Sequence, residues 1–302
     1  MDFEIAYNEN NRDKIAIVTG ANSGLGYETT LGLLQSGYTV IMACRNASKA
    51  QSASLELKRQ IHDARLHCMA LDLSDLRSVR AFSAEFQSRF NRLDVLVENA
   101  GIMMPKYQKT IDGFESQLGV NFLGHFLLAK LLFPLMDKTQ NARIISLSSV
   151  AHKKGRIHFS DLQSEKKYSK FGAYAQSKLA CFMFGYELHR RLKVAGSNMK
   201  SIITHPGGSN TELGRHLSPF WYKLFLPIIL LFTHSPKLAA LPSLMAALDD
   251  RVKSGDFVGP TGFAQLKGKP GVVIAEPHAY DENYAEKLWE KAEELTKVKF
   301  EI

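Results

Sequence analysis

Short apolar runs alternate along this chain with longer segments whose apolar residues recur at helical spacing. The first run, residues 14–19, leads into a glycine-rich turn and a helical stretch that ends near residue 34. Apolar runs of strand length follow at 39–43, 66–71, 95–97, 143–147 and 201–204. Between and after them the helical pattern predicts helices up to about residue 61 and over 76–90, 113–136, 173–192, 239–248 and 280–296.

The strand-length runs lack the polar alternation of a sheet with one face in water. Such strands are buried on both faces, as in a parallel sheet covered by helices. Repeated strand–helix units also give right-handed crossovers between parallel strands. The pattern therefore predicts an α/β fold, a doubly wound parallel sheet of Rossmann type with helices on both faces. We expect one domain over 1–302, with an N-terminal arm at 1–12 and a substrate lid at 207–236.

Glycines follow the first predicted strand in the spacing GxxxGxG, at Gly20, Gly24 and Gly26. Gly20 allows a tight exit from the strand, Gly24 lets the backbone approach a pyrophosphate, and Gly26 lets the helix pack closely on the sheet. The helix N-terminus presents free N–H groups to phosphates. The sequence therefore predicts a dinucleotide site. Its residues are Gly20, Asn22, Ser23, Gly24, Leu25 and Gly26.

The end of the second predicted strand bears on the choice of cofactor. Sites selective for NAD place an acidic residue there, about 20 residues past the glycines, to bind the ribose hydroxyls. Here no Asp or Glu occurs between Glu28 and Glu56, and the strand ends in ACRN, whose third residue is Arg45. A guanidinium can hold a 2′-phosphate with two parallel hydrogen bonds and stack on adenine. The pattern predicts NADP(H), selected mainly by Arg45.

A tyrosine and a lysine four residues apart, Tyr174 and Lys178, lie on the helix predicted after the fifth strand. Positions i and i+4 share one helix face, so the ammonium can lie beside the ring. A nearby positive charge favours the phenolate form of the tyrosine. Hydride transfer to a carbonyl needs an acid at the oxygen, and oxidation of an alcohol needs a base there. Tyr174 is the predicted general acid/base.

These motifs, in this order, resemble the short-chain dehydrogenase/reductase family over nearly the whole chain. The resemblance rests on Thr19 with the GxxxGxG spacing and on Tyr174 with Lys178. It implies an oxidoreductase that transfers hydride between NADP(H) and a carbonyl or alcohol. It also implies that Lys178 hydrogen-bonds the nicotinamide ribose.

Further residues match the cofactor motifs of the same family. Asp72-Leu73 matches the pair that holds the adenine, and Asn99-Ala100-Gly101 matches the end of the motif after the fourth strand. Glu98 stands where the family has Asn, a departure that bears on local hydrogen bonding in the sheet. Pro206-Gly207 with Thr211 matches the loop that cradles the nicotinamide carboxamide.

The remaining catalytic residues also come from the resemblance. Ser148 and Ser149 end the fifth strand at the carboxyl edge, where ligands bind in open α/β sheets. The family pattern assigns the contact with the substrate oxygen to Ser149. Asn121 matches the member that holds a water relaying protons to Lys178. The insert at 151–171 looks like that of the retinol-dehydrogenase-like branch, which implies a lipophilic substrate.

Composition narrows the partners. The net charge is +8, but the basic residues are scattered and the longest basic clusters are pairs such as Lys153-Lys154, so we expect no nucleic acid partner. The three widely spaced cysteines predict a reducing compartment without disulfides. His152, His158 and His205 lack ligand spacing and His125 is read as a packing residue, so no metal is expected. Residues 1–13 lack a signal-peptide pattern, which predicts a cytoplasmic protein.

Residues 220–232, FWYKLFLPIILLF, are almost wholly apolar. They are too short to span a bilayer, which needs about 20 apolar residues, and Pro227 interrupts them. We predict a mobile apolar lid over the substrate. Peripheral contact with a membrane surface and simple burial against the domain both stay open.

The apolar residues of helices 113–136 and 173–192 exceed what one buried face needs, which predicts a homodimer or homotetramer. The alternative function is a non-catalytic NADP(H)-binding sensor. The intact set of Asn121, Ser149, Tyr174 and Lys178 argues against it, because a pure binder has no need of the acid/base pair.

Overall fold

The computed structural model describes residues 3–208 and 235–302. Its centre is one eight-stranded sheet in the order β3-β2-β1-β4-β5-β6-β7-β8. Strands β1 to β7 pair in parallel and β8 is antiparallel to β7. The strands are β1 Ile15–Thr19, β2 Thr39–Cys44, β3 Leu66–Ala70, β4 Val95–Glu98, β5 Arg143–Leu147, β6 Lys200–Thr204, β7 Phe257–Pro260 and β8 Pro270–Val273. The predicted doubly wound parallel sheet is confirmed.

The helices follow the predicted order, with ends shifted by a few residues. They are α1 Gly24–Gln35, α2 Ala47–Gln60, α3 Leu76–Arg89, α4 Ser116–Leu118, α5 Gly124–Asp137, α6 Lys170–Val194, α9 Pro236–Leu248 and α10 Glu282–Thr296. Polar side chains cap several of them and explain the shifts. Ser169 accepts a hydrogen bond from Gly172 N and starts α6 three residues before the apolar pattern does.

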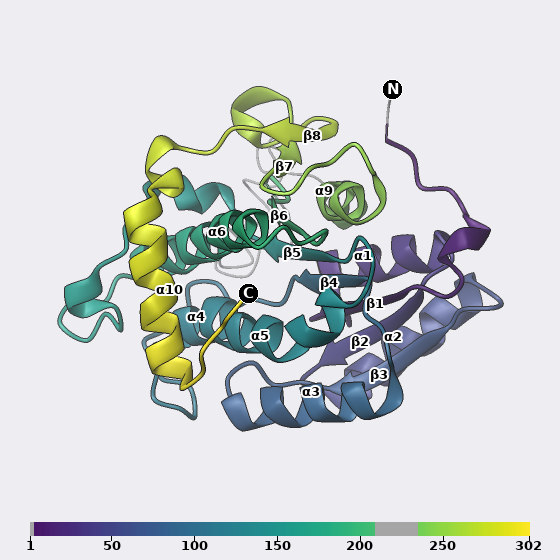
Figure 1. The fold of residues 1–302 in the computed structure, drawn as a ribbon, viewed down its shortest axis with the longest axis horizontal. Helices are drawn as coiled ribbons and strands as arrows, with labels where there is room; N and C mark the ends of the chain where they lie inside the picture. The colour runs from purple at the N-terminus through teal and green to yellow at the C-terminus, as the bar shows by residue number, and fades with distance from the viewer. Residues whose placement is uncertain (1–2, 209–234) are drawn as a thin grey trace, which may run out of the picture.

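Helices cover both faces of the sheet (Figure 1). Successive strand residues point to opposite faces. Ile17 packs in the core that α3, α5, α6 and α10 form on one face, whereas its neighbours Ala16 and Val18 pack in the core that α1, α2 and α9 form on the other. Both faces of β1 are therefore buried, which accounts for its unbroken apolar run in the sequence.

Two strands escaped the sequence pattern. β7 reads FVGP and β8 reads PGVV, each with a glycine and a proline, residues that are depleted in strands. They exist because β7 pairs with β6 through Ile203 and Thr204, and β8 then pairs with β7 at the sheet edge. Proline is tolerated at such an edge position.

The predicted helix at 113–136 begins at Ser116 and contains a π-helical segment, Gly119–Leu123, between α4 and α5. Within the described ranges, Ser116–Asp137 is one helix long and apolar enough to span a membrane, with a mean hydropathy of 1.6. Its apolar window is 72% buried inside the fold. Core helices of globular proteins can reach the same length and hydropathy, and this helix packs as a core helix.

The apolar faces that predicted a dimer meet partners within the chain. α10 packs against α6 (Figure 1). Trp289 of α10 lies 5.2 Å from Phe126 of α5 and 5.7 Å from Phe184 of α6, measured between ring centroids. Phe300 lies 5.4 Å from Phe133. This packing accounts for much of the apolar excess, and the dimer stays a prediction, as does the division into arm, domain and lid.

The chain reverses its winding direction between β1 and β4, which are neighbours in the sheet. From β1 the sheet grows through β2 and β3 on one side, and from β4 through β5 and β6 on the other. Loops at the carboxyl ends of these two strands diverge and leave a crevice, the usual ligand position in open α/β sheets.

Candidate active site

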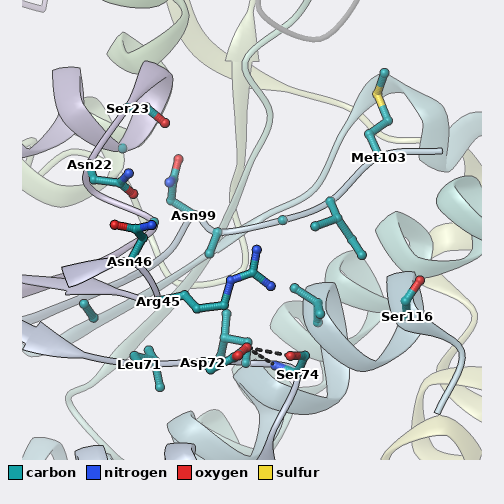
Figure 2. Close-up of a pocket in the computed structure, with 18 of the residues that line it drawn as sticks. Asn22, Ser23, Arg45, Asn46, Leu71, Asp72, Ser74, Asn99, Met103 and Ser116 are labelled. Carbon is teal, nitrogen blue, oxygen red and sulfur yellow. Dashed lines mark hydrogen bonds between the residues drawn. The ribbon is translucent and has the colours of Figure 1, made fainter. Parts of the chain in front are cut away.

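A cavity of about 680 Å³ opens at this crevice (Figure 2). Predicted cofactor residues that line it are Gly20, Asn22, Ser23, Gly24, Leu25, Gly26, Arg45, Asp72, Leu73, Asn99, Ala100, Gly101, Tyr174 and Lys178. We call its β2–β3 side, with Arg45, Asn46, Lys49 and Asp72, the outer end. Its β5 side, with Leu147, Tyr174 and Lys178, is the inner end. In the sheet, β1 and β4 separate the two ends.

The turn after β1 is held by backbone contacts that exclude larger side chains. Gly20 has a φ of 67°, in the left-handed region that favours glycine. A Cβ at Gly26 would lie 2.4 Å from the Gly20 carbonyl oxygen. Asn99 Nδ2 donates to the Thr19 carbonyl at 2.8 Å, and Ala100 N donates to Thr19 Oγ1 at 2.8 Å. The segments after β1 and β4 are thus fixed to each other at the bottom of the cavity.

The outer end combines cations with a fixed acidic turn. Figure 2 shows the Arg45 side chain between the segment that carries Asn99 and the segment that carries Asp72 and Ser74. Asp72 Oδ1 accepts hydrogen bonds from Ser74 N at 2.9 Å and Ser74 Oγ at 2.6 Å. Lys49 also lines the cavity. Sequence reasoning missed Lys49; its signal is a position four residues after Arg45, in the first turn of α2.

At the inner end α6 supplies the tyrosine–lysine pair. Tyr174 and Lys178 are each 4% exposed, and both line the cavity. Lys178 Nζ donates to the Leu147 carbonyl, the last residue of β5, at 2.9 Å. This hydrogen bond ties the ammonium to the carboxyl end of the sheet, beside the crevice.

The two serines after β5 make different contacts. Ser148 Oγ donates to the Lys178 carbonyl at 2.8 Å, which commits its proton to α6. Ser149 Oγ accepts from Ala151 N at 3.2 Å and keeps its own proton for another acceptor. Both serines are buried, and neither is among the cavity-lining residues. This difference supports the choice of Ser149, whose role stays a prediction.

Asn121 lies in the π-helical segment and behind the cavity. Its Oδ1 accepts from Ile102 N at 2.8 Å, and its Nδ2 donates to Ile102 O at 3.0 Å and Ser177 Oγ at 2.9 Å. π-Helical turns are frequent at functional sites because they redirect backbone carbonyls. Here the Asn121 carbonyl faces the ring of His125 and the thiol of Cys181. The predicted water relay to Lys178 stays a prediction.

His125 does more than pack. Its Nδ1 lies 2.9 Å from the Asn121 carbonyl and its Nε2 lies 2.9 Å from Thr19 Oγ1. Burial lowers the pKa of His125 to about 4, so the ring is neutral at pH 7. A neutral ring that donates from Nδ1 accepts at Nε2, which makes Thr19 the donor. His125 thereby joins the turn after β1 to the helix that carries Asn121.

Pro206 and Gly207 follow β6, and Thr211 lies outside the described residues. Gly207 has a φ of 75°, and a Cβ there would lie 2.5 Å from the Leu266 carbonyl oxygen. Gly208 N donates to that oxygen at 3.0 Å. The structure therefore places this loop against the β7–β8 connection, and neither Pro206 nor Gly207 lines the cavity. The apolar segment 220–232 also falls outside the described residues.

Glu98, the departure from the family motif, is a buried carboxylic acid. Its Oε2 accepts from Ser146 Oγ at 2.7 Å, across the pairing of β4 with β5. Burial raises the pKa of Glu98 to about 8, so the acid is mostly protonated at pH 7. β4 pairs with β5 through Glu98, so the departure leaves the sheet hydrogen bonding intact, and Asn99 keeps its place.

Comparison with known proteins defines the class. Residues 14–220 match the family of short-chain dehydrogenases, and the chain belongs to it. It is 40% identical to human retinol dehydrogenase 13 over 289 residues, 93% of this chain and 84% of that protein. It is 41% identical to human retinol dehydrogenase 14 over 297 residues, 93% of this chain and 85% of that protein.

Solved structures share the fold. The fold matches that of an uncharacterized protein from Mycobacterium paratuberculosis with a TM-score of 0.82 and 35% identity, over 100% of both chains. It also matches a short-chain dehydrogenase from Shigella flexneri complexed with NADP, with a TM-score of 0.61 and 22% identity, over 84% of this chain and 98% of that one. The protein is therefore a nucleotide-binding oxidoreductase of the short-chain dehydrogenase family with retinol dehydrogenase homologues.

Proposed function

We propose that this protein transfers hydride between NADP(H) and the carbonyl or alcohol group of an apolar substrate, with Tyr174 as general acid/base. The observation that carries the proposal is the buried pair Tyr174 and Lys178 at the inner end of a cavity whose outer end carries Arg45. One side of the cavity thus offers a proton donor, and the other offers a cation suited to a phosphate.

The residues present fit a nicotinamide dinucleotide. Ser23, the N-cap of α1, makes no side-chain cap hydrogen bond, and it lines the cavity together with Gly24, Leu25 and Gly26 of the first turn of the helix. The N–H groups of this turn suit a pyrophosphate. Arg45 and Lys49 suit the 2′-phosphate of NADP. Asp72 and Asn99 line the same cavity, which supports their proposed contacts with the adenine and the rest of the cofactor.

The nicotinamide supplies or accepts the hydride when it is bound. In reduction Tyr174 Oη donates a proton to the substrate oxygen, and in oxidation it takes the proton back. Lys178 lies on the same helix face as Tyr174, and its ammonium donates a hydrogen bond to the Leu147 carbonyl. In this position its charge favours the phenolate form of Tyr174, and we expect it to reach the nicotinamide ribose. Ser149 donates its free proton to the substrate oxygen and orients it toward Tyr174.

The substrate class follows from the relatives. Two of them are named retinol dehydrogenases and are 40% and 41% identical over most of the chain, which supports a lipophilic alcohol or aldehyde. A lid at 207–236, a cytoplasmic location with peripheral membrane contact, and a dimer complete the proposal.

A steady-state assay tests the proposed function. NADPH or NADH oxidation is followed with aldehydes, ketones and quinones as acceptors, and binding of each cofactor is titrated by its fluorescence. We expect turnover of an apolar aldehyde, with kcat/KM at least about tenfold higher for NADPH than for NADH. Tight NADPH binding without oxidation by any carbonyl would support the sensor instead, and a higher kcat/KM with NADH would refute the cofactor assignment.

A further inference from the structure

Two methionines form a small apolar cluster around the proposed catalytic tyrosine. Met103 and Met104 pack against Tyr174, Ala151 and Ala175, in a cluster separate from the two cores of the sheet. Both methionines are only partly buried. Met103 lines the cavity together with Tyr174, on the segment that continues from Asn99 (Figure 2).

The backbone at this point is strained and held in place. Met104 has a φ of 51°, in the left-handed region, which is uncommon for a residue with a side chain. Gln117 Oε1 accepts from Met104 N at 2.8 Å, and Tyr168 Oη donates to the Pro105 carbonyl at 2.9 Å. Gln117 Nε2 donates to Tyr168 Oη at 3.2 Å, which joins the two supports.

The supports come from different parts of the chain. Gln117 is fully buried and lies in the first turn of the helical segment that carries Asn121. Tyr168 belongs to the 151–171 insert, and Glu165 of the same insert pairs with Lys109 at 2.6 Å, Nζ to Oε1. Strained backbone persists where the surroundings determine it, and such positions concentrate at active sites and ligand contacts.

We propose that Met103 and Met104 form the apolar surface that selects the substrate, an inference that rests on the proposed function. They pack against the carbon chain next to the carbonyl that Tyr174 protonates. The class selected is aldehydes with an extended, unbranched or unsaturated chain, because unbranched methionine adapts to irregular chains and its sulfur contacts π systems favourably. Tyr168 is a positioning residue that holds the turn.

A chain-length series tests the proposal. We compare kcat/KM for straight-chain aldehydes from propanal to decanal in wild type and in the double variant Met103→Gln/Met104→Gln. In wild type kcat/KM rises by up to about fourfold per methylene, the worth of a buried CH₂. The double variant loses most of this rise, so that its kcat/KM depends much less on chain length than that of wild type. A uniform loss along the series, or none, would overturn the proposal.

Two variants sharpen the series. Met245→Gln, in a partly buried methionine of α9 on the other face of the sheet, is the matched control and should keep the wild-type slope. Tyr168→Phe removes the hydroxyl that holds Pro105, and it should raise the KM of decanal severalfold with kcat within about twofold of wild type. A fall in kcat at unchanged KM would contradict the positioning role.

A footprint gives a readout that is independent of turnover. Peroxide oxidation of each methionine is followed by mass spectrometry with NADPH alone and with NADPH plus 1-decanol, two reduced partners that cannot react with each other. We expect decanol to slow oxidation of Met103 and Met104 at least about threefold and to leave Met245 unaffected. Oxidation of Met103 and Met104 at the same rate with and without decanol would overturn the proposal. Failure of wild type to reduce any carbonyl would instead refute the proposed function.

Discussion

The outer and inner ends of the cavity are assembled differently. The outer end takes its residues from short stretches that follow β2 and β3, such as Arg45 and Asp72. The inner end draws on α6, the end of β5 and the loop after β4, and hydrogen bonds such as Lys178 to Leu147 join these parts. The proposed cofactor contacts of the outer end are thus local in sequence, whereas the proposed reaction site depends on packing. Variants at the inner end should therefore mainly lose turnover, and variants at the outer end should mainly lose cofactor affinity.

The largest effect is expected from Tyr174→Phe. The ring still packs in its cluster, but the proton donor is lost, so kcat should fall by about 10²-fold or more while NADPH affinity stays nearly unchanged. Initial rates and NADPH fluorescence titration measure the two quantities. Tyr186→Phe, on the same helix but away from the cavity, is the control. Near-wild-type turnover of Tyr174→Phe would remove the catalytic assignment.

Ser149→Ala should lower kcat/KM by about 10²-fold, the usual cost of losing one donor to a reacting oxygen. Ser148→Ala removes the hydrogen bond to the Lys178 carbonyl and should mainly lower thermal stability. Rates and melting temperatures of both variants separate the cases. Equal losses of activity, or the reverse order, would show that the two serines are assigned in the wrong register.

Arg45→Ala probes the outer end. Loss of a charge-assisted hydrogen bond to the 2′-phosphate should weaken NADPH binding by about 1.5–3 kcal/mol, roughly 10- to 150-fold, and barely change NADH binding. kcat at saturating NADPH should stay close to wild type. Lys49→Ala should act in the same direction but less, because an exposed ammonium makes a weaker contact. An equal loss of affinity for both cofactors would contradict phosphate recognition.

Glu98→Gln should have the smallest effect on turnover and a clear effect on stability. Because the folded protein holds a proton that the unfolded chain releases near pH 4.5, Glu98 lowers wild-type stability as pH rises from about 4.5 to about 8. The advantage of the variant should grow over this range, to the order of a few kcal/mol, and then level off. The neighbouring Cys181, whose pKa burial raises to about 11, stays neutral there. Urea unfolding at several pH values measures the difference in the free energy of unfolding between the variant and wild type. A difference that does not change with pH would contradict a buried acid with a raised pKa.

Much of this protein could be predicted from short stretches of its sequence. The apolar runs gave the strands that lie in the sheet interior, because burial on both faces leaves an unbroken apolar signal. The glycine spacing predicted the turn after β1, and the ACRN strand end predicted part of the outer end, since residues directly after parallel strands meet at one edge. That Tyr174 and Lys178 share one helix face follows from helix periodicity.

The sequence by itself determined the class of fold, the glycine turn after β1 and the tyrosine–lysine pair on one helix face, because each leaves a pattern within short stretches of the chain. Only the tertiary structure decided the rest. β7 and β8 form because β6 offers them a partner. His125 becomes a bridge because Thr19, 106 residues away, meets its ring. Met104 sits beside Tyr174 because Gln117 and Tyr168 hold a turn that no local preference of methionine would form. Such contacts join residues distant in the chain, and no short stretch of sequence encodes them.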